Sequence, residues 1–309
     1  MENIDFTTPE DLQHHFIKLD GRNIHVAVCG SGKPIILVHG WPEFWMAWLP
    51  LANQLKQKYT VLMPDLYGFG KSDKPEAISE GFGPKFHAND LSDLITFFGF
   101  ECVVTITHDV GAWVIQDLML NNPSKVFAGI FFNCPNSSIG TRWLTDGHIN
   151  KIWYQSLIQL DWSVNLIGYN KETCSIFLEA MTKDICYQKH AFDAVFDSWV
   201  ENFMSPNALA GSFSWYKSIN KMRLASIEEN LSPQGIKQPN TKLIEAPCLS
   251  YWGKHDPILK SEWRHTLSQH FRDIEIRLAN NAGHYVHIET PLSSFKMISK
   301  FLEKIKYLD

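Results

Sequence analysis

A turn at residues 107–113, with the sequence THDVGAW, constrains the fold of this chain more than any other feature. It follows the β-branched run at residues 103–106 and precedes a helical pattern of apolar residues, Val114, Ile115, Leu118 and Met119. A buried strand must therefore turn sharply into a helix, and small residues are favoured there because the crossing backbones leave no room for bulk. Asp109 stands at the centre of this turn.

Strand patterns alternate with helical patterns before and after the turn. The strands are expected at residues 16–19, 24–28, 34–38, 60–63, 103–106, 129–132, 248–252 and 274–278. Several of them are unbroken apolar runs, which are typical of parallel strands covered by helices on both faces. The alternation predicts an α/β fold built on a doubly wound, mostly parallel sheet.

The alternation stops between residues 137 and 239. This block is helical and aromatic, without a strong strand pattern, and it contains Trp143, Trp153, Trp162, Trp199 and Trp215. Strand patterns resume only after it. We therefore expect a helical cap at residues 137–239, inserted into a core domain formed by residues 1–136 and 240–309.

Composition excludes several classes of function. The 309 residues carry a formal charge of -5 without a basic stripe, so nucleic acid is not an expected partner. The six cysteines form no Cys-x-x-Cys pair, and neither a metal nor another cofactor is predicted. Residues 1–13 lack a signal-peptide pattern, and no run of 18 apolar residues occurs, so the expectation is a cytoplasmic protein without a membrane span. The oligomeric state cannot be predicted from these features.

Three residues with catalytic side chains follow strands of the predicted sheet. Asp109, Asp256 and His284 each come just after a strand pattern, and the carboxyl ends of parallel strands meet at one edge of the sheet. Their order along the chain, nucleophile, acid and histidine, is that of an α/β-hydrolase triad. We therefore expect the three side chains to lie together.

An aspartate in the place of the nucleophile changes the reaction. A carboxylate with a reference pKa of about 3.9 is already ionised at neutral pH and needs no base before it attacks. It can displace a leaving group at an sp3 carbon, which would leave an alkyl ester on Asp109. His284, oriented by Asp256, would then activate a water that hydrolyses the ester. The backbone N–H groups of Trp41 and Val110 are the expected donors to the oxyanion.

Five motifs carry a resemblance to a known family. They are HGWPExW at residues 39–45, DxxGxGxS at 65–72, HDxG at 108–111, GxxD at 253–256 and GH at 283–284. In this order they resemble the epoxide hydrolase and haloalkane dehalogenase branch of the α/β-hydrolase family, over nearly the whole chain. Two positions depart from that pattern, because Thr107 stands where glycine is common and Val110 where many members have tryptophan.

The resemblance implies different cap residues for the two reactions. An epoxide oxygen needs proton donors, which the family supplies as two cap tyrosines, and Tyr154 and Tyr216 lie in stretches similar to theirs. A shift of one residue would bring Trp153 to the place of Tyr154. The expected pocket residues are His39, Trp113 and Trp153, although His39 also fits a packing role near the turn.

Three functions follow from this resemblance. The first is an epoxide hydrolase that uses a small apolar epoxide and water and forms a vicinal diol. The second is a haloalkane dehalogenase that holds a halide with Trp41 and cap tryptophans, and the third is a ligand receptor without turnover. Similar haloacid dehalogenases carry arginines where this chain has Val110 and Trp113, so a carboxylate substrate is disfavoured.

Overall fold

Eight strands form a single sheet in the computed structural model, which describes residues 2, 4–145, 147–231 and 242–307. The strands are β1 (Gln13–Leu19), β2 (Arg22–Cys29), β3 (Lys33–Val38), β4 (Tyr59–Pro64), β5 (Val103–His108), β6 (Val126–Phe132), β7 (Cys248–Gly253) and β8 (Ile274–Ala279). Their order in the sheet is β1-β2-β4-β3-β5-β6-β7-β8. The pairs β1·β2 and β2·β4 are antiparallel and the others are parallel, so the predicted mostly parallel sheet is confirmed.

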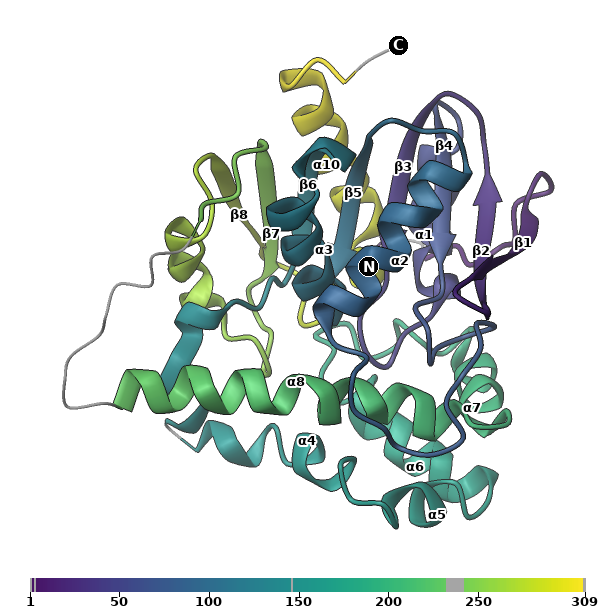
Figure 1. Ribbon diagram of the computed structural model, residues 1–309, viewed down its shortest axis with the longest axis vertical. Coiled ribbons are helices and arrows are strands. Elements are labelled where there is room, and N and C mark those ends of the chain that lie inside the picture. The colour runs from purple at the N-terminus through teal and green to yellow at the C-terminus, as the bar shows by residue number, and fades with distance from the viewer. Residues whose placement is uncertain (1, 3, 146, 232–241, 308–309) are drawn as a thin grey trace.

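Helices cover the sheet on both faces (Figure 1). Those of the core are η1 (Trp45–Trp48), α1 (Leu49–Leu55), α2 (Pro84–Phe97), α3 (Val110–Asn121), η2 (Pro123–Lys125), η5 (Ser261–Gln269), α9 (Val286–Glu289) and α10 (Pro291–Lys304). Helix α2 packs with α3 on one face, and α1 packs with α9 and α10 on the other. Every side chain of β5 is buried as a result, which explains its unbroken β-branched pattern.

A helical region lies between β6 and β7 and spans the edge of the sheet at which the parallel strands end (Figure 1). Its elements are η3 (Ser137–Leu144), η4 (His148–Asn150), α4 (Tyr154–Leu157), α5 (Ser163–Ile167), α6 (Lys171–Met181), α7 (Phe196–Met204) and α8 (Ala208–Leu231). We call it the cap. The expected boundary between residues 239 and 240 falls outside the described residues. Among the helices of the described part, none combines the length and the apolar character that crossing a membrane requires.

The cap is fastened to the core at several places. The indole N–H of Trp199 on α7 donates to the carbonyl of Pro42 over 2.9 Å. Gly68 of the core meets Gly211 of α8 so closely that a Cβ on Gly68 would lie 2.8 Å from the Gly211 carbonyl oxygen. Only glycine allows such a close approach of two backbones. The Trp199 bond therefore attaches α7 to the core, and the Gly68–Gly211 contact attaches α8.

Candidate active site

The turn that carries Asp109 is a strained junction between β5 and α3. Asp109 has φ of 45° and ψ of -114°, a backbone conformation that residues other than glycine rarely adopt. Such strained conformations are often found at functional sites. A Cβ on Gly111 would lie 2.6 Å from the carbonyl oxygens of Val38 and His39, which explains the need for glycine there. Thr107 fits because its hydroxyl donates to the Val38 carbonyl over 3.1 Å. The turn therefore presents Asp109 at the end of a buried strand.

Asp256 and His284 lie together on the neighbouring loops. Nδ1 of His284 is 2.9 Å from Oδ2 of Asp256, and both side chains are buried. Oδ1 of Asp256 accepts the backbone N–H groups of Ile258 and Leu259 over 2.8 and 2.9 Å. Because the carboxylate is fixed by these backbone donors, it can fix the orientation of the imidazole in turn.

Asn133, at the end of β6, supports the same pair. The two hydrogens of its side-chain NH2 group are shared among three acceptors, Oδ2 of Asp256 at 2.5 Å and the backbone carbonyls of Gly283 and His284 at 3.1 and 3.0 Å. Its side-chain oxygen accepts the N–H of Gly253 over 2.8 Å. A single buried amide therefore joins the loop of the acid to the loop of the histidine.

Charge in the site is balanced between these groups. Burial lowers the pKa of His284, but Asp256, together with Asp109 and Glu43, outweighs burial and raises that pKa to about 9. Burial raises the pKa of Asp109 above its ordinary value, while the nearby His284 and His108 oppose the rise. The opposite charges of the two groups therefore interact, since each favours the charged form of the other.

Trp41 brings a backbone donor to Asp109. Its N–H lies 3.4 Å from Oδ2 of Asp109, at the long end of hydrogen-bond range. Val110, the first residue of α3, is buried beside the carboxylate. The two residues expected to form an oxyanion hole therefore flank Asp109.

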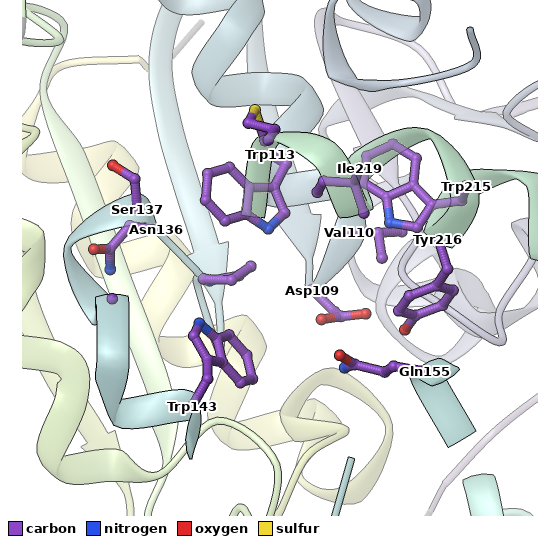
Figure 2. Close-up of a pocket in the computed structure, with 13 residues that line it drawn as sticks. Asp109, Val110, Trp113, Asn136, Ser137, Trp143, Gln155, Trp215, Tyr216 and Ile219 are labelled. Atoms are coloured by element: carbon purple, nitrogen blue, oxygen red, sulfur yellow. The ribbon is translucent and has the colours of Figure 1, made fainter. Parts of the chain in front are cut away.

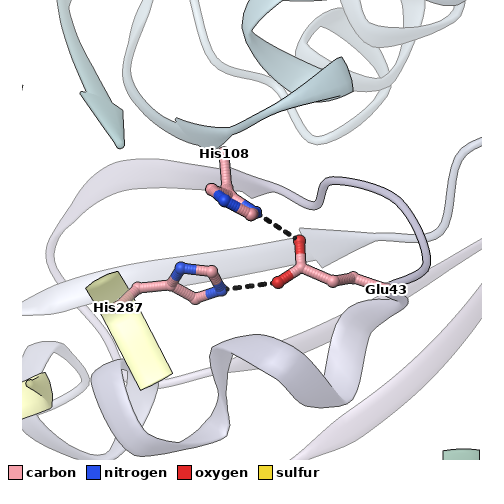
Figure 3. A group of neighbouring side chains, drawn as sticks. All are labelled: Glu43, His108 and His287. Atoms are coloured by element: carbon pink, nitrogen blue, oxygen red, sulfur yellow. Dashed lines mark hydrogen bonds and ion pairs between the residues drawn. The ribbon is translucent and has the colours of Figure 1, made fainter. Parts of the chain in front are cut away.

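A fully buried cluster of Glu43, His108 and His287 lies beneath the turn (Figure 3). Nδ1 of His108 is 2.8 Å from Oε2 of Glu43, and its Nε2 is 2.9 Å from the backbone carbonyl oxygen of His284. Both partners of the His108 ring are therefore oxygen atoms that accept hydrogen bonds. His108, which directly precedes Asp109, thus connects the turn to the loop of His284.

The same three residues are the one group among the described residues whose side chains could approach a metal ion, since their ligand atoms lie within 4.8 Å of one another. Nε2 of His287 lies 2.9 Å from Oε1 of Glu43, an ion-pair contact that is not aligned as a hydrogen bond. Gly40 also donates its N–H to Oε2 of Glu43 over 2.5 Å. Burial raises the pKa of Glu43, but His108 and His287 outweigh it and hold that pKa well below its ordinary value. Side chains in direct contact at 2.8 and 2.9 Å are joined to one another rather than spaced around an ion.

Tyr154 and Tyr216 approach from the cap. The ring of Tyr154 stacks on the indole of Trp41 with 5.2 Å between centroids and 4° between planes. Tyr216 meets Trp41 at 90° and Tyr154 at 85°, with centroids 5.3 and 5.9 Å apart. Three rings from three segments thus pack against one another beside Asp109, and both tyrosines are buried.

A pocket opens over Asp109 between the core and the cap (Figure 2). Trp113 and Trp143 face each other across it, and Gln155 and Tyr216 lie near the carboxylate at one end. None of the described residues that line it is Lys or Arg, and most of its wall is apolar. The pocket therefore suits a neutral apolar molecule, with Asp109 as the charged group that it meets.

A sequence model of the alpha/beta hydrolase fold family matches residues 33–291. The chain belongs to the α/β-hydrolase fold family. It is 25% identical to the soluble epoxide hydrolase of Corynebacterium sp. (strain C12), over 96% of this chain and 99% of that protein. It is 24% identical to the Homo sapiens protein named epoxide hydrolase 4, over 93% of this chain and 78% of that protein.

Solved structures share its fold. The epoxide hydrolase CorEH, without ligand, superposes with a TM-score of 0.80 at 24% identity and covers 95% of this chain and 99% of its own. Cfl2 from Burkholderia cenocepacia superposes with a TM-score of 0.77 at 20% identity and covers 94% and 96%. At these identities the likeness extends to the fold and not to the substrate.

Two residues expected at the pocket of this α/β hydrolase lie elsewhere. His39 is fully buried, accepts the N–H of Leu66 at Nε2 over 3.1 Å and contacts the Gly40 carbonyl through Nδ1 over 2.8 Å. It therefore holds two loops together as a neutral ring. Trp153 is 45% exposed and packs on the outer side of Tyr154. Tyr154, the first residue of α4, is 4% exposed, so Tyr154 and not Trp153 is the buried residue of the two.

Residues that sequence reasoning missed complete the site. Gln155 lines the pocket, and its amide lies 3.3 Å from the hydroxyl of Tyr154. Asn133 supports Asp256, and Glu43 with His287 supports His108. A polar residue at the end of a buried strand was the available signal for Asn133. No comparable pattern marks Gln155, whose position depends on the packing of α4.

Proposed function

We propose that this α/β hydrolase is an epoxide hydrolase, which converts a small apolar epoxide and water to a vicinal diol. Ring opening begins with the carboxylate of Asp109 attacking a ring carbon. A C–O bond of the epoxide breaks, and the oxygen that leaves takes a proton from a cap tyrosine, Tyr154 or Tyr216. The product of this step is a hydroxyalkyl ester on Asp109.

Hydrolysis of the ester completes the cycle. His284 takes a proton from a water that attacks the ester carbonyl carbon, and Asp256 stabilises the imidazolium that forms. The backbone N–H groups of Trp41 and Val110 stabilise the oxyanion, at about 3 kcal/mol for each well-placed donor. Collapse of the intermediate breaks the ester C–O bond, and the departing alkoxide takes the remaining proton of the attacking water, which gives the diol and the carboxylate. The proton held by His284 returns to the tyrosinate, so the enzyme is restored.

The observation that carries this proposal is the position of the two tyrosines. Tyr154 and Tyr216 pack around Trp41, and the backbone N–H of Trp41 contacts Asp109. An sp3 displacement at Asp109 that expels an alkoxide requires acids on the side opposite the carboxylate, which is the side that the cap provides. The names of the Corynebacterium and human relatives support the same reaction class.

An oxygen-isotope experiment tests the proposal. Wild-type enzyme in excess over an aromatic or aliphatic epoxide is mixed in water enriched in oxygen-18, and one turnover is allowed. We expect an unlabelled diol, because the added oxygen comes from Asp109, and oxygen-18 in the Asp109 peptide by mass spectrometry. A labelled diol with an unlabelled peptide would show direct attack by water. The absence of any diol across a panel of epoxides would refute the proposal.

A haloalkane dehalogenase is the second candidate, and one observation favours it. Among the described residues, the buried indole N–H of Trp41 meets no hydrogen-bond acceptor, and an indole N–H in such a place can hold a halide. Bromoalkanes added to the same panel separate the two candidates. Release of bromide without diol formation from any epoxide would favour the dehalogenase. Tight, reversible binding without turnover of either class would favour a receptor.

A further inference from the structure

Glu289, at the end of α9, is a buried carboxylate outside the groups that act in the proposed reaction. Its Oε1 accepts the backbone N–H groups of Gly283 and Tyr285 over 3.0 and 3.1 Å. Its Oε2 accepts those of Tyr187 and Gln188, each over 2.8 Å. Gly283 and Tyr285 enclose His284, whereas Tyr187 and Gln188 belong to the cap. One carboxylate therefore joins two segments that lie far apart in the sequence.

We call these segments the histidine loop (residues 280–285) and the cap turn (residues 182–188). Further contacts connect them directly. The backbone N–H of His284 lies 3.4 Å from the carbonyl oxygen of Ile185, and the side chain of Gln188 donates to the Asn281 carbonyl over 3.0 Å. The hydroxyl of Tyr285 donates to the carbonyl of Met181, at the end of α6. The cap turn is thus a wall against which the histidine loop is held.

The close approach of the two segments depends on Gly283. A Cβ there would lie 2.7 Å from the backbone nitrogen of Tyr187 and 2.9 Å from the carbonyl oxygen of Ile185. No side chain fits between the segments, so the glycine of the Gly-His motif also serves the contact with the cap. The cap turn follows α6, whose Phe177 meets the indole of Trp41.

We propose that Glu289 is a positioning residue that couples the cap to the catalytic base, by locking the histidine loop onto the cap turn. It is not the nucleophile, the base or a proton donor of the proposed reaction, and its bonds to Gly283 and Tyr285 let it act through the placement of His284. Because His284 is needed for hydrolysis of the ester and not for its formation, Glu289 serves the second step. This inference rests on the proposed function.

The electrostatics of Glu289 agree with a role for its charge. Burial raises its pKa, while the N–H groups of Gln188, Gly283, Tyr285 and Tyr187 favour the ionised form. Four backbone donors can be satisfied by two carboxylate oxygens, whereas an amide offers one oxygen and turns its own N–H groups toward donors. Glutamine at this position therefore keeps the size of the side chain and loses part of the bridge.

The test compares Glu289→Gln with wild type and with Ser218→Ala in single-turnover experiments on an epoxide. Ser218 accepts the N–H of Phe82 over 3.0 Å, so its removal breaks another bond between cap and core, away from the histidine loop. In Glu289→Gln we expect ester hydrolysis to slow by about 10- to 100-fold, since a small misplacement of a catalytic group has effects of this size. Ester formation should stay within about threefold, so that the Asp109 adduct accumulates.

Hydrogen exchange supplies a readout that needs no substrate. Peptides that cover the histidine loop and the cap turn should lose protection together in Glu289→Gln and keep it in Ser218→Ala. If Glu289→Gln does not fold, Gln188→Ala removes the exposed bond to Asn281 and should slow ester hydrolysis alone, by about threefold.

The outcomes separate the inference from the proposed function. If wild type forms no ester with any epoxide, the proposed function fails, and the exchange experiment still tests the coupling. Equal slowing of both steps in Glu289→Gln, or exchange that rises in neither segment, would overturn the inference. The inference would also be overturned if Ser218→Ala slowed both steps as much as Glu289→Gln does.

Discussion

The two halves of the active site are held in different ways. In the core, Asp109, Asp256 and His284 stand at strand ends and are fixed by hydrogen bonds to backbone groups and to Asn133. In the cap, Tyr154 and Tyr216 are fixed by the packing of their rings around Trp41. The contacts described for the core half are mainly directional hydrogen bonds, whereas aromatic packing is prominent in the cap half, where Gln155 also contacts the Tyr154 hydroxyl.

We expect the two halves to serve different steps of the proposed reaction. Hydrolysis of an ester needs a base and donors in fixed geometry, which a hydrogen-bonded core supplies. Ring opening must accept substrates of varied shape, and a wall of aromatic rings adapts to them more readily. Substitutions in the core should therefore cost more activity than substitutions in the cap, and they should affect different steps.

Replacement of the nucleophile should have the largest effect. In Asp109→Ala no ester can form, and kcat/KM for an epoxide should fall by about 10⁴-fold or more, as it does when a nucleophile is removed from other enzymes. Diol formation measured by chromatography, with circular dichroism as a check on folding, tests this expectation. Asp197→Ala on α7 is a control that removes a carboxylate far from the turn. A residual rate above about one hundredth of wild type would mean that Asp109 is not the nucleophile.

Replacement of the base should stop the reaction halfway. In His284→Gln the ester should form and persist, with turnover reduced by about 10³-fold because water is no longer activated. Intact-protein mass spectrometry should show an adduct of substrate mass located on the Asp109 peptide. His265→Gln, which alters an exposed ring on η5, is the matched control. Full turnover in His284→Gln would exclude the histidine as the base.

Loss of a cap hydroxyl should slow only the first step. Tyr216→Phe and Tyr154→Phe each remove a proton donor while they keep the ring packing, and ester formation from an epoxide should slow by about 10²-fold. A bromoalkane needs no proton, so its rate should change little in either variant. Rapid mixing followed by acid quench measures the ester directly. Equal losses with both substrate types would assign the tyrosines to packing and not to proton transfer.

The pH dependence of ester hydrolysis should reveal coupling within the core half. Asp256 raises the pKa of His284 most, and Asp109 adds to the rise, so that this pKa is about 9 in the free enzyme. Esterification removes the negative charge of Asp109, so the pKa of His284 should fall below about 9 in the intermediate. Because the neutral ring is the base, ester hydrolysis should rise with pH and level off above this lower pKa. The pH dependence of single-turnover rates gives the pKa of His284 in the intermediate, and an NMR titration gives its pKa in the free enzyme. Identical pKa values in the two states would show that Asp109 and His284 do not interact.

The sequence predicted the core half better than the cap half, for a physical reason. All eight strands were expected, because each has a local strand pattern, and the places of Asp109, Asp256 and His284 after strands then follow. The cap offers no such rule. Whether Tyr154 or Trp153 turns inward depends on where α4 begins, and Gln155 enters the pocket through the same packing. Support from Asn133 and Glu289 was missed because it joins loops that are remote in the sequence.

Replacement of Trp153, at the exposed side of the cap half, should have the smallest effect. Trp153 is 45% exposed and meets Tyr154 and Phe177 edge-on, so Trp153→Phe removes little buried contact. We expect a change in the free energy of unfolding within about 0.5 kcal/mol and a change in kcat/KM within about threefold. Thermal unfolding and steady-state kinetics measure both quantities, and Tyr154→Phe is the comparison because it changes the adjacent, buried residue. A loss of activity in Trp153→Phe as large as that in Tyr154→Phe would mean that the indole reaches the substrate, and the assignment of the inward-facing residue would then be wrong.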